Sequence, residues 1–244
     1  MWALFKKELR SFLSSVIGYV VIAVFLLLTG LFMWGFPGNL NILDQGYATL
    51  DTLFYVAPWV FMFLVPAVTM RSFSEEKRTG TIELLFTRPL TDSSIILAKF
   101  FAGVALVILA LLPTLIYLYS VVELGNPEGN VDMGGTWGSY LGLFFLASGF
   151  TAIGIFASAI SDNQVVSFII ALFLCFFCYS GLNQIASFDL FGSLDRFIQS
   201  LSIAEHYDSM SRGVIDTRDV VYFIVLSGIF IILTRGILKN RRIA

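Results

Sequence analysis

Residues 70–99 read MRSFSEEKRTGTIELLFTRPLTDSSIILAK, a charged segment between two apolar runs that are each long enough to cross a bilayer. Five of the fifteen Lys and Arg residues of the chain lie in this segment: Arg71, Lys77, Arg78, Arg88 and Lys99. Loops with an excess of Lys and Arg stay on the cytoplasmic side of a membrane. The sequence therefore predicts that residues 71–94 form a cytoplasmic loop.

The composition indicates an integral membrane protein. Hydrophobic residues make up 57% of the 244 residues and charged residues only 13%, whereas soluble domains have about 25% charged residues. A net charge of −2 gives no concentrated basic surface, so no nucleic-acid partner is expected. Cys175 and Cys178 lie in an apolar run without a second Cys pair or a nearby His, and we interpret them as helix residues.

Six apolar runs of about 20 residues predict an all-α polytopic membrane protein with six transmembrane helices. The predicted spans are residues 16–36, 52–70, 95–122, 140–160, 165–187 and 220–238. With the amino terminus inside, twelve of the fifteen basic residues fall on the cytoplasmic side, and only Arg196, Arg212 and Arg218 fall outside. Both termini are therefore predicted to be cytoplasmic, and the lipid bilayer is the surrounding partner.

Several prolines and glycines lie within these spans. Pro58, Pro66 and Pro113 free backbone carbonyls and favour kinks, which serve either motion or packing. Gly149 and Gly154 allow close helix approach, either within the chain or at an interface with another subunit.

Residues 1–15 are predicted to form an amphipathic interfacial helix. Trp2, Phe5, Leu9, Phe12 and Leu13 recur at spacings of three and four, and the polar residues Lys6, Lys7, Arg10 and Ser14 lie largely on the opposite side. Basic residues there suit the anionic headgroups of the inner leaflet. The helix serves either as a membrane anchor or as a lever against a cytosolic subunit.

Within the charged segment, the pattern predicts a helix, a hinge and a second short helix. Gly80 breaks the first helix, Thr81 is placed to cap the second, and Pro89 ends it. Glu75 and Glu76 are expected to pair with nearby arginines, namely Arg71, Arg78 or Arg88. Glu83 and Arg88 are the expected pairing sites for a partner, beside an exposed apolar edge of Leu84, Leu85 and Phe86. The alternative is a loop packed back on its own helices.

The run EEKRTGTIELLFTRPL, residues 75–90, resembles the cytoplasmic loop after the second span of ABC-2 type transporter permeases. The six-span order and the run HYDSMSRGVIDTRDVVYF, residues 206–223, are also similar to that family. The resemblance covers nearly the whole chain and implies a single permease domain over residues 1–244. Within the family, the chain is most similar to the gliding-motility-associated permeases of Bacteroidetes.

The resemblance also implies where the functional residues lie. The family's coupling helix falls on residues 80–85 and sits in a cleft of the ATP-binding subunit, and the family's interfacial helix also touches that subunit. The coupling residues would be Glu75, Glu76, Gly80, Thr81, Ile82, Glu83, Leu84, Leu85, Arg88 and Pro89. The interfacial-helix residues would be Phe5, Lys6, Lys7, Leu9, Arg10 and Phe12. Short extracytoplasmic helices are expected within residues 188–219, over 190–201 and 203–212, with Asp216 and Asp219 capping the last span.

The implied partners and cofactors follow from the same resemblance. The sequence contains no Gly-x-x-x-x-Gly-Lys-Ser/Thr motif, so the chain itself is not expected to be an enzyme or to hold a cofactor. ATP and Mg would be bound by a cytosolic ABC ATPase subunit. A second permease subunit is expected, either a copy of this chain or a larger gliding-type membrane partner with an outer domain. The location would be the bacterial inner membrane.

Three other functions compete with this interpretation. An ion-coupled secondary transporter places ionisable residues in its spans, and the central portions of these spans have none. An intramembrane metalloprotease needs several ligands at bilayer depth, whereas the only histidine, His206, is predicted outside as a hydrogen-bonded polar residue of the outer helices. A membrane scaffold of a motility machine that transports nothing remains open.

Overall fold

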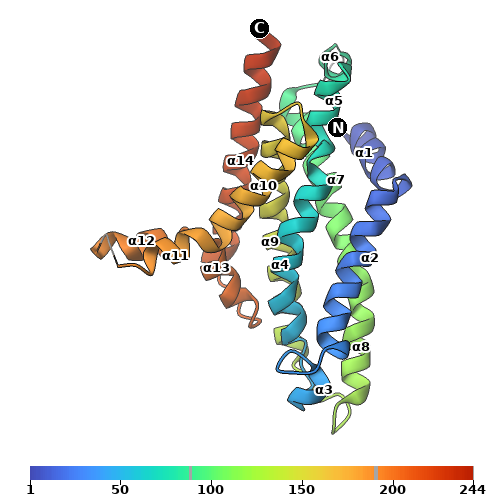
Figure 1. Cartoon of the computed structure of the whole chain (residues 1–244), viewed down its shortest axis with the longest axis vertical. Coiled ribbons are helices and arrows are strands. Elements are labelled where there is room, and N and C mark those ends of the chain that lie inside the picture. The colour runs from blue at the N-terminus through green and yellow to red at the C-terminus, as the bar shows by residue number, and fades with distance from the viewer. Residues whose placement is uncertain (88–89, 190–191, 244) are drawn as a thin grey trace.

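The computed structural model describes residues 1–87, 90–189 and 192–243, and over these residues it is helical without any strand. Six helical segments in the described residues are long and apolar enough to cross a membrane, as the sequence predicts. They are Val16–Gly35, Asp51–Arg78, Asp92–Leu124, Met133–Ile160, Gln164–Ala186 and Thr217–Asn240. Figure 1 shows most of them running along one axis as an elongated bundle.

The helices follow one another with short connections. Their bounds are α1 (Trp2–Ser14), α2 (Val16–Gly30), α3 (Ile42–Gln45), α4 (Asp51–Thr69), α5 (Arg71–Arg78), α6 (Thr81–Phe86), α7 (Asp92–Leu111), α8 (Leu115–Leu124), α9 (Met133–Ile160), α10 (Gln164–Phe176), α11 (Leu182–Ala186), α12 (Asp195–Gln199), α13 (Ile203–Met210) and α14 (Thr217–Ile243). Short π or 3-10 turns are η1 (Leu31–Gly35), η2 (Leu112–Thr114), η3 (Phe177–Gly181) and η4 (Gly192–Leu194).

Helix α9 is the centre of the bundle. It contacts α4, α7, α10 and α14, and 78% of its most apolar window is buried. Glycines let neighbouring backbones approach closely: a Cβ atom on Gly154 would lie 2.0 Å from Oγ1 of Thr69, and one on Gly149 would lie 3.2 Å from Leu226. Both glycines therefore make contacts within the chain.

The prolines of the spans have different effects. Pro58 and Pro66 lie inside α4, which stays helical through both. Pro113 lies in the 3-10 turn η2, which separates α7 from α8 within the third span. A proline removes a backbone donor, and a 3-10 turn is a common way to accommodate the loss.

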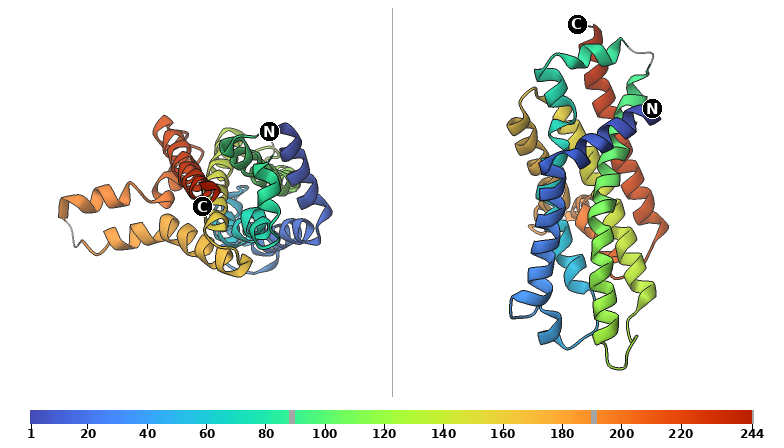
Figure 2. Two further views of the ribbon diagram at one scale, coloured as in Figure 1. Left: turned by 90° about the horizontal axis from the view of Figure 1, so that it is seen from above. Right: turned by 90° about the vertical axis from the view of Figure 1, so that its right-hand side faces the viewer.

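The fifth predicted span is not a straight rod. Helix α10 has 13 residues, which at 1.5 Å per residue gives roughly 20 Å, too short for a 30 Å hydrocarbon core. The π turn η3 follows, and α11 then runs sideways out of the bundle and pairs with α12 (Figures 1 and 2). A π turn inserts an extra residue into a helix and gives the chain a place to change direction.

Helix α13 packs back into the bundle. Its residues Ile203, Tyr207 and Met210 are almost fully buried, and the Tyr207 hydroxyl donates to the carbonyl of Phe54 at 2.7 Å. The predicted helix over 203–212 ends at Met210, and Gly213 follows in a left-handed conformation with φ of 79°.

The start of the last span is held by Asp216 and Asp219 in different ways. Asp216 accepts a hydrogen bond from the backbone N–H of Arg218 at 2.9 Å, as a cap does. Asp219 does not cap; it lies 2.7 Å from Nδ1 of His206. The other ring nitrogen of His206 lies 2.9 Å from the carbonyl of Ser200, so this histidine is hydrogen-bonded, as predicted; its location on the outer side stays a prediction.

Both chain ends lie at the same end of the bundle, together with α5 and α6 (Figures 1 and 2). The connection between α8 and α9 and the short helix α3 lie at the opposite end (Figure 1). We call these the terminal end and the loop end of the bundle.

The close approach at Gly154 can be tested by substitution. Gly154→Val should destabilise the bundle by about 1–3 kcal/mol because its side chain overlaps Thr69. Gly228→Val in α14 is the matched control, since no atom lies within 4 Å of the position that a Cβ atom would take there. Thermal unfolding followed by size-exclusion chromatography in detergent measures both. Equal melting temperatures for the two variants would contradict the close contact between Gly154 and Thr69.

Candidate coupling site

The charged segment continues the second span beyond α4. Helix α5 follows at Arg71, and Gly80 then adopts a left-handed conformation with φ of 71° before α6 begins. Glycine adopts this conformation without the steric cost that a side chain brings. The result is a helix, a glycine corner and a second helix, in the predicted order.

The predicted cap at Thr81 is wrong. Gly80 occupies the capping position of α6, and no side chain accepts a hydrogen bond from its first turn. The hydroxyl of Thr81 instead lies 2.9 Å from that of Thr79 and 3.4 Å from the carbonyl of Glu76. The two threonine hydroxyls therefore satisfy carbonyls at the end of α5, which the left-handed corner leaves open.

Helix α5 is fixed to the bundle by buried side chains. Phe73 is 1% exposed and packs in the same apolar cluster as Ile95, Ile96 and Ile155. The ammonium of Lys77 is buried, donates to the carbonyl of Ala159 at the end of α9, and lies 3.6 Å from Asp162. Lys77 thereby holds α5 against the turn between α9 and α10.

A buried ion cluster joins three helices at this end. Lys99 of α7 is 2% exposed, and its ammonium donates to the carbonyl of Ser72 at 2.7 Å, to Glu76 of α5 at 2.9 Å and to Glu8 of α1 at 3.3 Å. Lys7 lies 3.2 Å from Glu8 and 3.7 Å from Glu76. We call Lys7, Glu8, Glu76 and Lys99 the ion cluster.

The ion cluster differs from the predicted pairing. Glu76 was expected to pair with arginines of its own segment, but it pairs with Lys99 and Lys7. Glu75 is exposed and makes no ion pair within the described residues. Among the described residues, the cations that reach Glu76 come from other helices, Lys99 from α7 and Lys7 from α1, and no ion pair joins it to Arg71 or Arg78.

Sequence reasoning missed Glu8. It is the only acidic residue before Asp44, and it stands four residues after Leu4, which is also buried. Residues four apart lie on the same face of a helix. The register of this lone carboxylate with an apolar leucine was the only available signal in the sequence, and it does not identify the partner of Glu8.

The electrostatics of the ion cluster favour the charged form of Lys7. Burial lowers the pKa of Lys7, but the charges and hydrogen bonds of Glu8 and Glu76 outweigh it, so the pKa of this ammonium is raised. Lys7 therefore stays protonated across the physiological pH range. Breaking a buried pair by removing one partner is costly, because the remaining charge stays buried without compensation.

Helix α6 divides its apolar residues between two sides. Ile82 is buried in the cluster with Leu4 and Phe73, Leu85 is half-buried, and Leu84 is 65% exposed beside the exposed Glu83. Of the predicted apolar edge, Leu84 faces outward and Leu85 is partly covered, while Ile82 anchors α6 on the bundle. The side chain of Phe86, and all of Arg88 and Pro89, lie outside the described residues, so the predicted pairing at Arg88 and the stop at Pro89 stay predictions.

Helix α1 lies across the terminal end of the bundle and packs mainly on α7 (Figure 2). Lys6 and Arg10 are exposed, and Phe5, Leu9 and Phe12 are half-buried. A groove between α1 and α6 is lined by Leu4, Lys7, Glu76, Thr81, Leu84, Leu85 and Leu90, with Met1 and Ala3. Of the expected residues, Lys7 of α1 and Glu76, Thr81, Leu84 and Leu85 of the charged segment border this groove.

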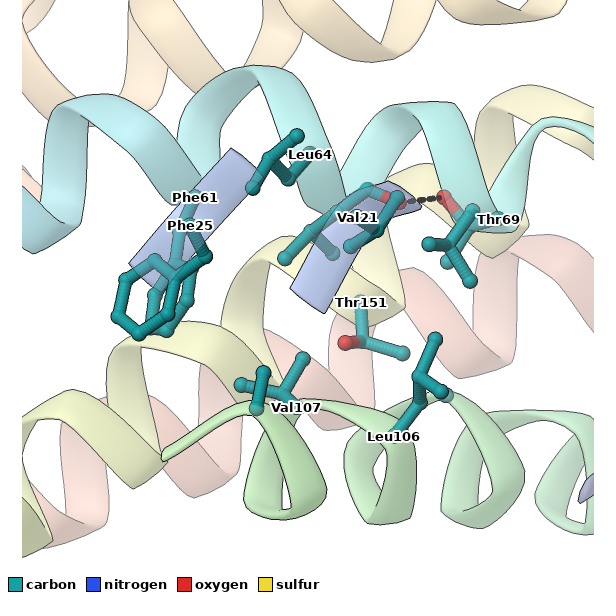
Figure 3. Close-up of a pocket in the computed structure, with 12 residues that line it drawn as sticks. Val21, Phe25, Phe61, Leu64, Thr69, Leu106, Val107 and Thr151 are labelled. Carbon is teal, nitrogen blue, oxygen red and sulfur yellow. Dashed lines mark hydrogen bonds between the residues drawn. The ribbon is translucent and has the colours of Figure 1, made fainter. Parts of the chain in front are cut away.

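A second cavity lies inside the bundle between α2, α4, α7 and α9 (Figure 3). It has a volume of about 20 Å³, room for one water at most. Its walls are apolar apart from Thr69 and Thr151, and their hydroxyls donate to carbonyls of their own helices, Val65 and Ala147. This cavity is a packing defect and offers no binding chemistry.

This architecture of apolar helices defines a multi-pass membrane protein. A comparison with protein families shows that the chain belongs to the ABC-2 family of transporter proteins, since the family model described as "ABC-2 family transporter protein" matches residues 2–236. The chain is thus a membrane permease component of the ABC transporter class and not the ATPase; permeases of this family normally work with a cytosolic ATPase. A search of curated proteins found no match.

The ion cluster can be tested through Lys99. Lys99→Met should destabilise the terminal end by about 3–5 kcal/mol, because Glu8 and Glu76 lose their buried counter-charge. Protease cleavage of α1 and the melting temperature in detergent measure the effect. Arg10→Met on the exposed side of α1 is the control.

A triple variant distinguishes charge from packing. Combining Lys99→Met with Glu8→Gln and Glu76→Gln removes all three charges and should recover part of the loss. A triple variant less stable than Lys99→Met would contradict the electrostatic account of the cluster.

Proposed function

We propose that this chain is the permease subunit that receives mechanical input from a separate cytosolic ATPase, with α6 as the coupling helix. The observation that carries the proposal is that α6 stands at the tip of α5, with Glu83 and Leu84 exposed, while α5 is clamped to α1, α7 and α9. A force applied at α6 would therefore be passed to the spans as a rigid-body movement.

The proposed ATPase would supply the nucleotide chemistry. ATP and Mg would be bound by that subunit, and its contact surface on this chain would be the groove between α1 and α6 with the exposed Glu75, Glu83 and Leu84. Gly80 would be needed to hold the corner, and Ile82 to seat α6 on the bundle. Movement of a substrate or mechanical work would follow from tilting of the spans.

The terminal end is proposed to face the cytoplasm of the bacterial inner membrane. It carries α1, α5, α6 and the end of α14, and these segments hold most of the basic residues of the chain. The positive-inside rule places such an end in the cytoplasm. The hairpin of α11 and α12 would then lie toward the outer leaflet.

A second membrane subunit is part of the proposal. Phe188, Leu194 and Phe197 on or beside the α11–α12 hairpin are each more than half exposed. An apolar hairpin that projects from a bundle at membrane depth contacts lipid or another subunit. We propose a partner permease there, either a copy of this chain or a larger gliding-type protein with an outer domain. The sequence similarity to gliding-motility permeases supports a role in gliding or an associated secretion.

The orientation is tested by labelling single cysteines. After Cys175 and Cys178 are replaced by Ala, a Glu83→Cys variant in spheroplasts should react with an impermeant maleimide only after lysis. Glu128→Cys, in the connection between α8 and α9, should react without lysis. Both residues are exposed, so accessibility in the protein is matched. The opposite labelling pattern would contradict the orientation and with it the coupling site.

The coupling site is tested by affinity purification from native membranes with mass spectrometry. An ABC ATPase and a second membrane subunit should co-purify with the wild-type chain. Glu83→Lys should reduce recovery of the ATPase by at least about tenfold and leave the membrane partner, because it reverses an exposed charge on α6. Glu128→Lys at the loop end is the control. Undiminished ATPase recovery with Glu83→Lys would refute docking at α6, and a partner of ordinary permease size would refute the gliding-type assignment.

A further inference from the structure

The α11–α12 hairpin projects sideways from the bundle and returns to it through residues 200–202, which we call the hairpin root (Figure 1). Two side chains from outside the hairpin hold this root by its backbone. Ring atom Nε2 of His206, on α13, lies 2.9 Å from the carbonyl oxygen of Ser200. The hydroxyl of Tyr222, on α14, donates to the carbonyl of Leu201 at 2.7 Å. The course of the hairpin where it leaves the bundle therefore depends on these contacts.

Both ring nitrogens of His206 face hydrogen-bond acceptors. Nδ1 lies 2.7 Å from a carboxylate oxygen of Asp219, and Nε2 faces the carbonyl of Ser200. A carbonyl and an ionised carboxylate can only accept, whereas a neutral imidazole has a single N–H to donate. A neutral ring beside the carboxylate would therefore turn a lone pair toward one of the two acceptors. The observed geometry requires one proton more, which makes the ring an imidazolium paired with a carboxylate.

The surroundings of the ring favour the imidazolium. Its plane is stacked on the ring of Tyr222, with centroids 3.9 Å apart and an angle of 20° between the planes. A cation over the face of a tyrosine ring is attracted to its π electrons. Asp219 is 8% exposed, and in the described part of the chain His206 is the only cation paired with it. A buried carboxylate without a cation is costly, so Asp219 also favours the protonated ring.

No second charged partner competes for the ring. Among the ion pairs of the described residues, only that with Asp219 involves His206. Tyr222 and the nearby Cys178 belong to residue types that ordinarily titrate above about pH 8. The other charged residues of α12, α13, the start of α14 and their connections are Asp195, Arg196, Glu205, Asp208, Arg212, Asp216 and Arg218.

We propose that His206 is a pH-sensitive clasp on the hairpin root, closed when the ring carries both protons and open when it loses one. Histidine is the side chain whose charge ordinarily changes between about pH 5 and pH 8. The doubly protonated ring prevails at low pH, so the clasp stabilises the root there, and this stabilisation is lost as the pH rises. One acceptor, on Asp219 or at Ser200, then has no donor.

Opening of the clasp would free the root without unfolding the bundle. The Ser202 hydroxyl donates to the carbonyl of Tyr179 at 2.7 Å, and neither group of this hydrogen bond titrates between about pH 5 and pH 8. The hairpin would thus stay attached while its root moves more freely. The clasp is a property of this chain alone and depends neither on a partner at the hairpin nor on coupling to an ATPase.

The first test needs no variant, because His206 is the only histidine of the chain. In the full chain, purified without a histidine tag and placed in liposomes, ¹⁵N-histidine labelling and solid-state NMR report this ring alone. Both nitrogens should carry a proton at about pH 5, and one should lose it by about pH 8.

Hydrogen exchange of residues 195–202, corrected for the pH dependence of free amides, then reports the root. Its protection should fall at least about tenfold over the same pH range, the size of one lost charge-assisted hydrogen bond. The fall should have the midpoint of the ring titration. A ring with an unchanged number of protons over this range, or protection that does not follow the ring, would overturn the proposal.

Asp219→Asn separates the clasp from a merely structural contact. The amide of an asparagine can donate to Nδ1, so a neutral ring can donate from Nε2 to Ser200 and both hydrogen bonds are made. Protection of the root should therefore persist at about pH 8 in this variant. A structural contact that does not depend on protonation gives no reason for a carboxamide to protect the root at high pH. A fall in Asp219→Asn equal to that of the wild type would contradict the clasp.

His206→Gln and Glu205→Gln complete the test. His206→Gln should give weak protection at both pH values, and a pH response that survives in it would overturn the proposal. Glu205→Gln is the matched control, because Glu205 is the neighbouring titratable residue on α13 and its carboxylate accepts from the side chain of Gln199 at 3.1 Å. It should keep the wild-type response, and loss of the response there would assign the titration to Glu205 instead. If His206→Gln does not fold, Asp219→Asn and the ring titration still decide the question.

Discussion

The terminal end of this permease depends on one buried ammonium, that of Lys99. It lies between Glu8 of α1 and Glu76 of α5, and it also holds the carbonyl of Ser72 where α5 begins. A buried ammonium without carboxylate partners is costly, and buried carboxylates without a cation are costly too. The three helices must therefore meet in one arrangement, which fixes α1 and α5 relative to the third span.

The arrangement of the spans supports this end of the molecule. Helix α9 is the common contact for α4, α7, α10 and α14, and Gly154 lets α4 pass close enough for Thr69 to touch its backbone. Because lipid gives no hydrophobic drive for helices to associate, close packing of small residues and hydrogen bonds decide how they meet. Lys77 then ties the end of α5 to the end of α9. The charged segment is thus an extension of the bundle rather than a loose loop.

The rigid attachment of α5 to the bundle matters for how a permease of this class would receive a force. A surface helix passes on a force only if its base resists bending, and α5 is held by an apolar cluster around Phe73, by Lys77 and by the ion cluster. Its tip presents Leu84 outward. At the opposite side, the bend at η3 sends α11 and α12 away from the bundle, where a second subunit or lipid would meet them. The proposed input and the proposed partner surface lie on different parts of the same rigid body.

The sequence by itself determined the six spans, the charged segment after the second and the glycine corner at Gly80, because apolar length, charge placement and glycine are local properties of the chain. It could not determine the ion cluster, since Glu8 and Lys99 are 91 residues apart and each resembles an ordinary polar residue in its own segment. The same reason applies to α6, where only the packing around Phe73 decided that Ile82 faces inward and Leu84 outward. The sideways course of α11 was decided by tertiary structure as well, because an apolar run of span length does not reveal where its helix bends.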